Sequence, residues 1–394
     1  WEYALRKVPG VDRWRVALKA DFDWLLSAHN GQGWRYNHSS RDWDNSCSQY
    51  GVLGLWAGMR AGYKVPDGMW AKLSQHFLSV QNPDGGWGYI TGGSSPNMAT
   101  AGLASMFLVF DAFHGKRAYA RGQAEHADEG AEQVLAAIAK GMDWLASQEG
   151  RGNTDSYYLY GIERTAVAGG RKYLGGADWF RDGAQTVLQA QQPDGSIELG
   201  RGPVVGTALS TLFMVYGGAP VAFDKLQWGD DQDWNRNPRD LANVTRQLWS
   251  AYERPLNWHT VSLSAPVEEF EAPILFLSGT RAPTLTAADK ALLRTYVARG
   301  GVILAEPSDH APAFKQAMEA LATELFPEGR LAPLAAEHPL FTVVKQPWQT
   351  RPALRGLDHG GRTVFFLSDG YLAQAWQVGD VEADAFKLAM NLLF

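Results

Sequence analysis

Amphipathic helical stretches alternate with polar, glycine-rich turns along the first half of the chain. Apolar helix residues come before each turn, at Phe22–Leu26, Phe77–Val80, Met142–Leu145 and Val187–Leu188. The turns that follow are His29–Trp34, Gln81–Trp87, Gln148–Gly152 and Gln191–Ile197. Two of them contain Pro-Asp-Gly, in which proline fixes φ, aspartate bonds the backbone ahead and glycine supplies a positive φ. We therefore predict that each turn ends one helix and redirects the chain, with its aromatic residue packed back against the helix.

Small residues dominate the helical stretches after the turns, which are Gln49–Ala61, Met98–Ala112 and Val205–Val215. Their Ala, Gly, Leu and Met side chains allow helices to approach closely. An outer helix, a turn and an inner helix, repeated around a ring, form an α/α barrel in which each repeat buries its apolar face against its neighbours. We predict this architecture for the first domain.

The pattern changes from about Pro220 onwards. Strand-like runs lie at Trp258–Leu263, Ile274–Leu277, Val302–Ala305 and Thr363–Leu367, and helices are predicted at Asp240–Tyr252, Ala287–Ala298, Ala313–Leu325 and Ala383–Leu393. Thr286 and Asp289 have the spacing of a capping box, which favours a crossover helix between parallel strands. We therefore predict a multidomain α and α/β protein, with an α/α repeat domain at residues 1–228 and a small parallel-sheet α/β domain at residues 229–394.

A polar, turn-rich segment, Gly229–Asp240, follows the predicted boundary. Its carboxylates Asp230, Asp231 and Asp233 suggest calcium, but the order lacks the loop glycine and the terminal acid of an EF-hand. We predict a solvated linker here.

Composition narrows the classes of function. The 394 residues carry a formal net charge of −6, with 45% hydrophobic and 20% charged residues. Without a basic block or an apolar run long enough to span a bilayer, we expect a soluble protein that binds no nucleic acid and has no transmembrane span. Cys47 is the only cysteine, so no internal disulfide can form. Because the chain starts at Trp1, we expect a processed protein, with a periplasmic or secreted location favoured.

The turn around Gln81, Gly85 and Trp87 has the pattern Gln-x-x-x-Gly-x-Trp. It resembles the repeat of squalene-hopene cyclases and protein prenyltransferase β subunits, and the resemblance covers roughly residues 15–216. It implies an α/α toroid. Four turns are fewer than a complete ring holds, so the ring is expected to be incomplete, or completed by an upstream segment or a homo-oligomer.

The same resemblance directs attention to Asp42-Trp43-Asp44-Asn45 before the first inner helix. Cyclases of this family protonate an alkene with the middle acid of Asp-x-Asp-Asp, so the resemblance places Asp44 at the acid position, with Asp42 beside it. Asn45 stands where the family has the last aspartate, which weakens the coupling that keeps one carboxyl protonated. The alternative interpretation is that Asp44 or Ser46 caps the helix.

Prenyltransferases hold zinc through Asp, Cys and His, and Cys47 with Asp44 and one of His29, His38 or His114 would imitate that set. The spacing gives this hypothesis no support, and a lone cysteine on an apolar helix is usually a small buried hydrophobe. We therefore expect no metal and no cofactor.

Aromatic and polar residues crowd the predicted mouth of the ring. They are Trp34, Tyr36, His38, Trp43, Tyr50, Trp87, Tyr89, Asn97, Tyr157, Tyr158, Tyr160, Glu163, Arg164 and Trp179. Such a lining would hold an isoprenoid through ring faces or a glycan through stacking and polar edges. The alternative is structural, with Trp34, Trp87 and Trp179 as plugs of the repeats and with Glu163 and Arg164 as a pair on one helix.

If the ligand is an acidic glycan, the residues suggest a lyase. Tyr157 or Tyr158 with His38 would abstract a proton, and Arg164 would neutralise a carboxylate. A cyclase needs an almost wholly apolar pocket, so an inward-facing Arg164 favours sugar over isoprenoid.

Three segments of the C-terminal part, Trp234–Asp240, Asn257–Gly301 and Gly360–Trp376, resemble a bacterial domain of unknown function, family 4159. The resemblance implies a class I amidotransferase-like fold, whose cysteine nucleophile would stand within Ala305–His310. This segment has no cysteine, which excludes thioester chemistry. Ser308, Asp309 and His310 are adjacent in sequence, but triad members normally come from separate loops, so we predict that Ser308 caps a helix.

The preferred functional hypothesis is a ligand-binding or assembly protein with an aromatic-lined toroid cavity and a catalytically silent α/β domain. The alternative is a toroid enzyme, either a terpene-cyclase-like protein using Asp44 or a glycan-active lyase.

Overall fold

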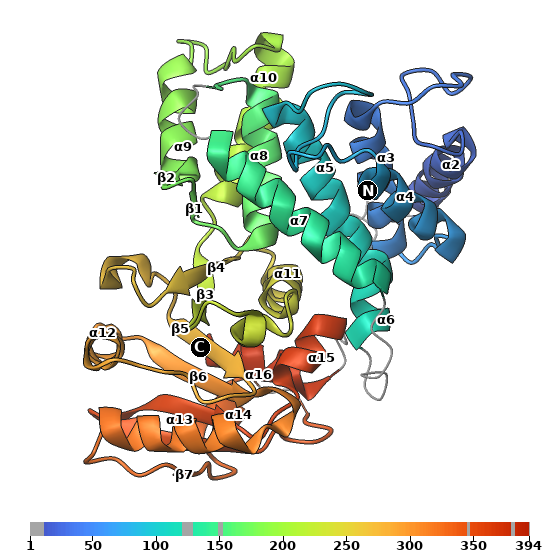
Figure 1. Ribbon diagram of the computed structural model, residues 1–394. Helices are drawn as coiled ribbons and strands as arrows, with labels where there is room; N and C mark the ends of the chain where they lie inside the picture. Colours follow the sequence, from blue (N-terminus) through green and yellow to red (C-terminus); the bar gives the residue numbers. More distant parts are fainter. Residues whose placement is uncertain (1–11, 120–128, 149–152, 345–346, 380–382, 394) are drawn as a thin grey trace. The chain divides into compact units, whose positions relative to one another are not determined.

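The computed structural model describes residues 12–119, 129–148, 153–344, 347–379 and 383–393. The chain divides into two compact units, one built mainly from residues up to Met214 and the other mainly from Val215 onwards. The first unit is helical and the second is a mixed α/β structure. Both are drawn in Figure 1.

The first unit consists mainly of helices that follow one another along the chain, joined by turns and loops (Figure 1). In chain order they are α2 (Asp12–Ala28), α3 (Asn45–Arg60), α4 (Asp67–Ser79), α5 (Pro96–Val109), α7 (Glu129–Gln148), α8 (Ser156–Gly169), α9 (Trp179–Ala190) and α10 (Gly202–Gly217). Short elements between them are η1 (Phe110–His114), α6 (Gly115–Tyr119), β1 (Tyr173–Leu174) and β2 (Ala177–Asp178). Helix α5 packs against α3, α4 and α7, which makes it the centre of the described bundle.

The predicted turns lie between the paired helices. Gln81 and Trp87 form an antiparallel bridge between α4 and α5, and Gln191 and Ile197 form the equivalent bridge between α9 and α10. Gly85 takes a φ of 99°, as the Pro-Asp-Gly turn requires. The prediction that these turns redirect the chain is confirmed. Residues 149–152 of the Gln148 turn lie outside the described residues.

Tryptophans from two turns fill the space between helices. The indole Nε1 of Trp34 donates to the Leu25 carbonyl, and that of Trp87 donates to the Phe77 carbonyl. Both rings are buried. They lie against glycines on α3 and α5, since a Cβ at Gly51 would meet the Trp34 ring at 2.4 Å and one at Gly102 would meet the Trp87 ring at 2.3 Å. Each of these two tryptophans therefore fills space between neighbouring helices.

By length and composition alone, Pro96–Tyr119 is the one stretch of the described residues that could cross a bilayer. Of its most apolar window, 78% is buried. Burial of this kind is typical of a core helix.

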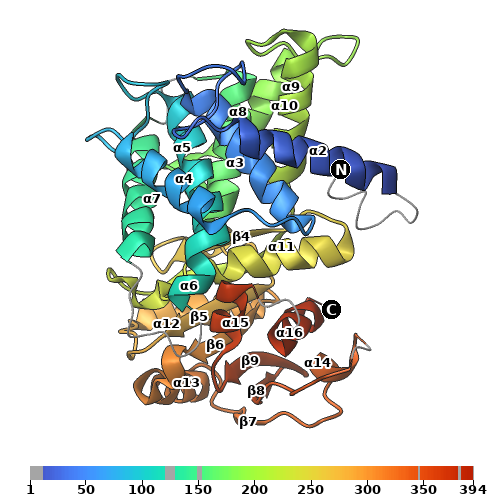
Figure 2. The same ribbon diagram turned by 90° about the vertical axis from the view of Figure 1, so that its right-hand side faces the viewer.

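The second unit contains a seven-stranded sheet with the order β4-β3-β5-β6-β9-β8-β7. Its strands are β3 (Val221–Gln227), β4 (Asn257–Ser262), β5 (Ile274–Gly279), β6 (Val302–Pro307), β7 (Ala332–Pro333), β8 (Leu354–His359) and β9 (Arg362–Ser368). The first five in the order run parallel, and β8 joins β9 as an antiparallel hairpin, visible in Figure 2. The predicted parallel sheet is therefore present, with an antiparallel edge that the pattern did not indicate.

Helices cover both faces of this sheet. They are α11 (Asp240–Tyr252), α12 (Ala287–Ala298), α13 (Pro312–Leu325), α14 (Pro339–Thr342), α15 (Leu372–Val378) and α16 (Asp384–Leu392), with the 3₁₀ turns η2 (Gln232–Asn235), η3 (Val267–Glu269) and η4 (Ser308–His310). Alternate strand residues point to opposite faces. Leu275 and Leu277 join α12 and α13 in one core, whereas Ile274 and Phe276 join α11, α15 and α16 in the other.

The capping box and the position of strand β3 can be compared with the sequence predictions for this unit. The capping box at Thr286 and Asp289 is formed, with both side-chain to backbone bonds present. Strand β3 lies upstream of residue 228, where the sequence analysis placed the domain boundary. Its residues Ala222–Leu226 are buried.

The predicted linker contains a short helical turn at Gln232–Asn235, and the prediction of a solvated segment is wrong for Asp233 and Trp234, which are buried. This stretch forms η2, and Trp234 packs into the core of the sheet. The Asp233 carboxylate accepts hydrogen bonds from the Thr280 amide and hydroxyl and from the Arg281 amide. It holds the loop after β5.

Candidate functional site

Side chains of α3 and α8 meet in a hydrogen-bonded chain in the helical unit. The Tyr157 hydroxyl lies 2.9 Å from Ser46 Oγ and accepts a hydrogen bond from Gln49 Nε2. Gln49 Oε1 in turn accepts from Arg164 Nη1 at 3.0 Å. We call this group, together with Tyr50, Tyr160 and Arg201, the tyrosine–arginine cluster.

Two guanidinium groups lie over tyrosine rings of the cluster. Arg164 Cζ is 5.3 Å from the Tyr160 ring centre, and Arg201 Cζ is 5.2 Å from that of Tyr157. Asp155 anchors Arg201 through two hydrogen bonds, of 2.7 and 3.1 Å. The cluster thus presents aromatic faces and fixed positive charges together.

The phenols of the cluster are neutral hydrogen-bonding groups at neutral pH. Burial raises the pKa of Tyr50, Tyr157 and Tyr160 above the ordinary value, and the nearby Arg164 only partly offsets this. A tyrosine with a raised pKa is a poor proton acceptor. Its hydroxyl remains able to donate to an oxygen of a ligand.

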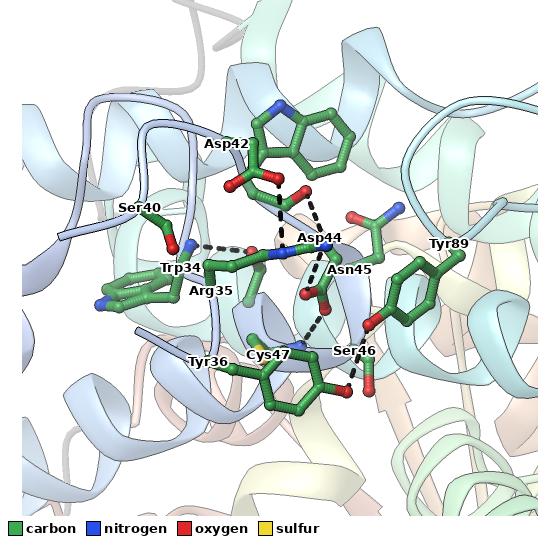
Figure 3. A network of polar contacts seen from close by, with 12 residues as sticks. Trp34, Arg35, Tyr36, Ser40, Asp42, Asp44, Asn45, Ser46, Cys47 and Tyr89 are labelled. Atoms are coloured by element: carbon green, nitrogen blue, oxygen red, sulfur yellow. Dashed lines mark hydrogen bonds and ion pairs between the residues drawn. The ribbon is translucent and has the colours of Figure 1, made fainter. Parts of the chain in front are cut away.

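A second network of polar contacts surrounds Asp44, as Figure 3 shows. Asp44 is fully buried and is the N-cap of α3, where its Oδ1 accepts from the Cys47 amide. Its Oδ2 pairs with Arg35 Nη1 at 3.1 Å. The capping interpretation of Asp44 is confirmed. Asp42 is largely exposed and lies 3.5 Å from Arg35 Nε.

Tyr36 and Tyr89 extend this network of polar contacts towards solvent. The Tyr89 hydroxyl donates to that of Tyr36 at 3.1 Å (Figure 3), and the Arg35 guanidinium lies 5.8 Å from the Tyr89 ring centre. Both tyrosines are exposed. They offer ring faces and hydroxyls close to the ordered Arg35.

Asn45 has a structural role. Its Nδ2 donates to the Gly88 carbonyl, and its Oδ1 lies 3.3 Å from His76 Nε2. The Trp43 ring packs edge-on against His76. Burial lowers the pKa of His76 to about 4, so its imidazole is neutral. Asn45 thus joins the start of α3 to α4 and to the residue that follows the Gln81 turn.

Other predicted site residues lie apart from the cluster. Trp34, Trp87 and Tyr158 are buried in the core, and His38 is exposed. Among the described residues, no hydrogen bond joins His38 to Tyr157 or Tyr158.

Cys47 is a protonated thiol. Burial and the adjacent Asp44 carboxylate raise its pKa to about 11. Zinc binds the thiolate form, and within the described ranges no three His, Cys, Asp or Glu side chains converge as a metal site.

In the α/β unit, Asp309 and His310 bond separate partners and do not form a triad with Ser308. Asp309 pairs with Arg236 at 2.9 Å, and His310 Nδ1 donates to the Asp369 carbonyl at 2.6 Å. Ser308 Oγ is buried and has no hydrogen-bond partner in the described part of the chain. The prediction that Ser308 caps a helix is wrong, because Ala311 is the N-cap of α13.

Sequence analysis did not select Gln49, Arg201 or Arg35. Each is a common polar residue with no motif around it, and its role depends on contacts with distant residues. The one local signal is the helical spacing of Ser46, Gln49 and Tyr50, which places them on one face of α3.

Comparison with known protein families supports the resemblance predicted for the C-terminal part of the chain. Residues 222–394 match the family described as Domain of unknown function (DUF4159). A search of curated proteins found no match.

Proposed function

We propose that the helical unit binds a hydroxyl-rich, acidic ligand of the glycan class at the tyrosine–arginine cluster. The observation that carries this proposal is the hydrogen bond from Arg164 to Gln49, because it aims a guanidinium along the same face as Tyr157 and Tyr160. Sugar rings stack on aromatic faces, and their hydroxyls and carboxylates pair with phenol and guanidinium groups.

The isoprenoid alternative has less support. A cluster of two arginines, a glutamine and several phenols is costly to desolvate against a hydrocarbon. Cyclase chemistry also needs a carboxyl proton that faces the substrate, whereas both oxygens of Asp44 face the Cys47 amide and Arg35. Binding without catalysis is the simpler role for these residues.

We further propose that the helical hairpins are part of an α/α toroid and that the α/β unit is an amidotransferase-like domain without catalytic activity. The equivalent bridges Gln81–Trp87 and Gln191–Ile197, each between two consecutive helices, support the first statement. The isolated hydroxyl of Ser308 supports the second, since a serine nucleophile needs a base within hydrogen-bond reach. Exposed apolar residues on α2 and α10, among them Val16 and Val204, support assembly with further copies of the chain.

Isothermal titration of the full chain with tetragalacturonate, and with neutral maltotetraose, tests the proposal. We expect saturable binding of the acidic sugar, at least about tenfold tighter than of the neutral one. Arg164→Gln should remove most of this preference. Arg181→Gln, on the exposed face of α9, is the matched control and should leave it unchanged. Equal binding of both sugars, or no effect of Arg164→Gln, would reject the proposal.

A further inference from the structure

A groove in the α/β unit is lined by none of the residues of the tyrosine–arginine cluster. It has a volume of about 550 Å³ and is lined by the ends of α12 and α13 and by the β8–β9 hairpin. Arg294, Phe326, Pro327, Glu328, His359 and Arg362 are among its lining residues. The groove adjoins the first residues of β6 and β9. Ligands of parallel α/β sheets usually bind at the opposite, carboxyl ends of the strands.

Two arginines of the groove are held in place by helix carbonyls. Arg294 donates from Nε to the Leu325 carbonyl at 3.2 Å and from Nη2 to the Glu324 carbonyl at 3.0 Å. Arg362 donates from Nη2 to the Val297 and Gly301 carbonyls, at 2.7 and 3.0 Å. These bonds order both side chains before any ligand arrives, which lowers the entropic cost of binding.

The two arginines carry more positive charge than the acidic lining of the groove balances. Neither Arg294 nor Arg362 forms an ion pair with a carboxylate in the described part of the chain, and each keeps further N–H donors. Glu328 is the one acidic residue in the lining. Glu324, on the neighbouring turn of α13, is already paired with Lys290 at 2.8 Å.

The remaining walls are apolar and aromatic. Phe326 is buried, and its ring centre lies 5.0 Å from that of His359, at 38° between the planes. Buried Leu325 and Val364 form the floor. The volume lies in the range of roughly 300–1,000 Å³ that is typical of small-molecule sites.

We propose that this groove binds a small organic anion, a carboxylate attached to a flat, apolar body. The carboxylate pairs with the free N–H groups of Arg294 and Arg362, and the body lies against Phe326, Pro327 and His359. This site is independent of the tyrosine–arginine cluster, so either proposal can fail alone.

Titration of the full chain with 2-naphthoate, followed by saturation-transfer NMR and calorimetry, tests this site. Its neutral isostere 2-naphthamide keeps the flat body and removes the charge. We expect the amide to bind at least about tenfold more weakly, the loss that one charge-assisted hydrogen bond produces. Arg294→Gln should weaken naphthoate by a similar factor. Lys315→Gln, near the start of α13, outside the lining and paired with Asp369, should not.

Arg362 caps α12, so its replacement is judged only together with a thermal melt. Arg362→Lys keeps the charge but loses the planar fork, and it should bind naphthoate at least threefold more weakly. The comparison of acid and amide on the unmodified protein needs no variant. Equal affinity for acid and amide, absence of saturable binding, or an unchanged affinity in Arg294→Gln would each overturn the proposal.

Discussion

Tyr157 on α8 and Gln49 on α3 are joined by a hydrogen bond between residues 108 positions apart in the sequence. Their helices are not consecutive along the chain, because α4, α5, α6 and α7 lie between them in sequence order. The bond therefore connects two helices that are distant in sequence. It makes the Tyr157 hydroxyl the centre of the candidate ligand site.

Tyr157→Phe removes this hydroxyl and keeps the ring. Gln49 and Ser46 lose a partner, so we expect a loss of about 1 kcal/mol in the free energy of unfolding. Binding of tetragalacturonate should weaken severalfold. Tyr63→Phe is the control, since its hydroxyl bonds the Arg15 carbonyl at an exposed position. A Tyr157→Phe protein that matches wild type in urea unfolding and in calorimetry would contradict the assigned role.

Asp44→Ala tests whether this buried carboxylate is structural. The substitution removes the N-cap of α3 and the partner of Arg35, so we expect destabilisation of about 2–3 kcal/mol. Asp42→Ala changes the neighbouring, largely exposed carboxylate and should stay within about 0.5 kcal/mol. Chemical denaturation of both variants measures the difference. Similar small effects of both substitutions would show that the cap and ion pair contribute little.

Glu163 makes the stability of the helical unit depend on pH. Burial raises the pKa of this carboxyl to about 8 from an ordinary 4.5, and Arg164 opposes the rise. Between these two values the folded state holds a proton that the unfolded state releases, so the contribution of Glu163 to stability falls as pH rises.

Glu163→Gln should abolish that contribution. The free energy of unfolding of the variant minus that of wild type should increase from pH 5 to pH 8, by at most about 1.4 kcal/mol per pH unit. Denaturant unfolding at several pH values measures the trend. Glu132→Gln on α7, where no comparable burial exists, should show a flat difference. A flat or falling difference for Glu163→Gln would show that its carboxyl is ionised in the fold.

Lys225 and Asp240 form a buried ion pair in the α/β unit. Lys225 Nζ lies 2.8 Å from both carboxylate oxygens, and both side chains are excluded from solvent. Lys225→Met leaves the carboxylate unpaired and should cost about 3–5 kcal/mol. The double variant with Asp240→Leu should recover part of the loss in urea unfolding. A double variant that is less stable by the sum of the two single effects would contradict a direct coupling.

The sequence by itself determined the local features of this protein. Pro-Asp-Gly turns, the Thr286 capping box and the runs of strand-like residues depend on neighbours within a few positions, and each appears where it was predicted. Glycines opposite Trp34 and Trp87 belong to the same small-residue pattern that indicated close helix packing. Strand β3 was missed because the charged residues Asp224 and Lys225, which are buried in the fold, interrupt its apolar run.

The hydrogen bonds and ion pairs between distant polar residues became known only from the folded structure. Asp44 had two interpretations in the sequence, and its burial against Arg35 selects the structural one. Arg164 reaches Gln49 across 115 positions, and Arg294 and Arg362 meet at one groove from separate elements. The periodicity of apolar residues indicates which face of a helix is apolar, but it does not indicate which distant element covers that face. These contacts arise when the helices and strands pack, so the positions of both candidate sites follow from packing.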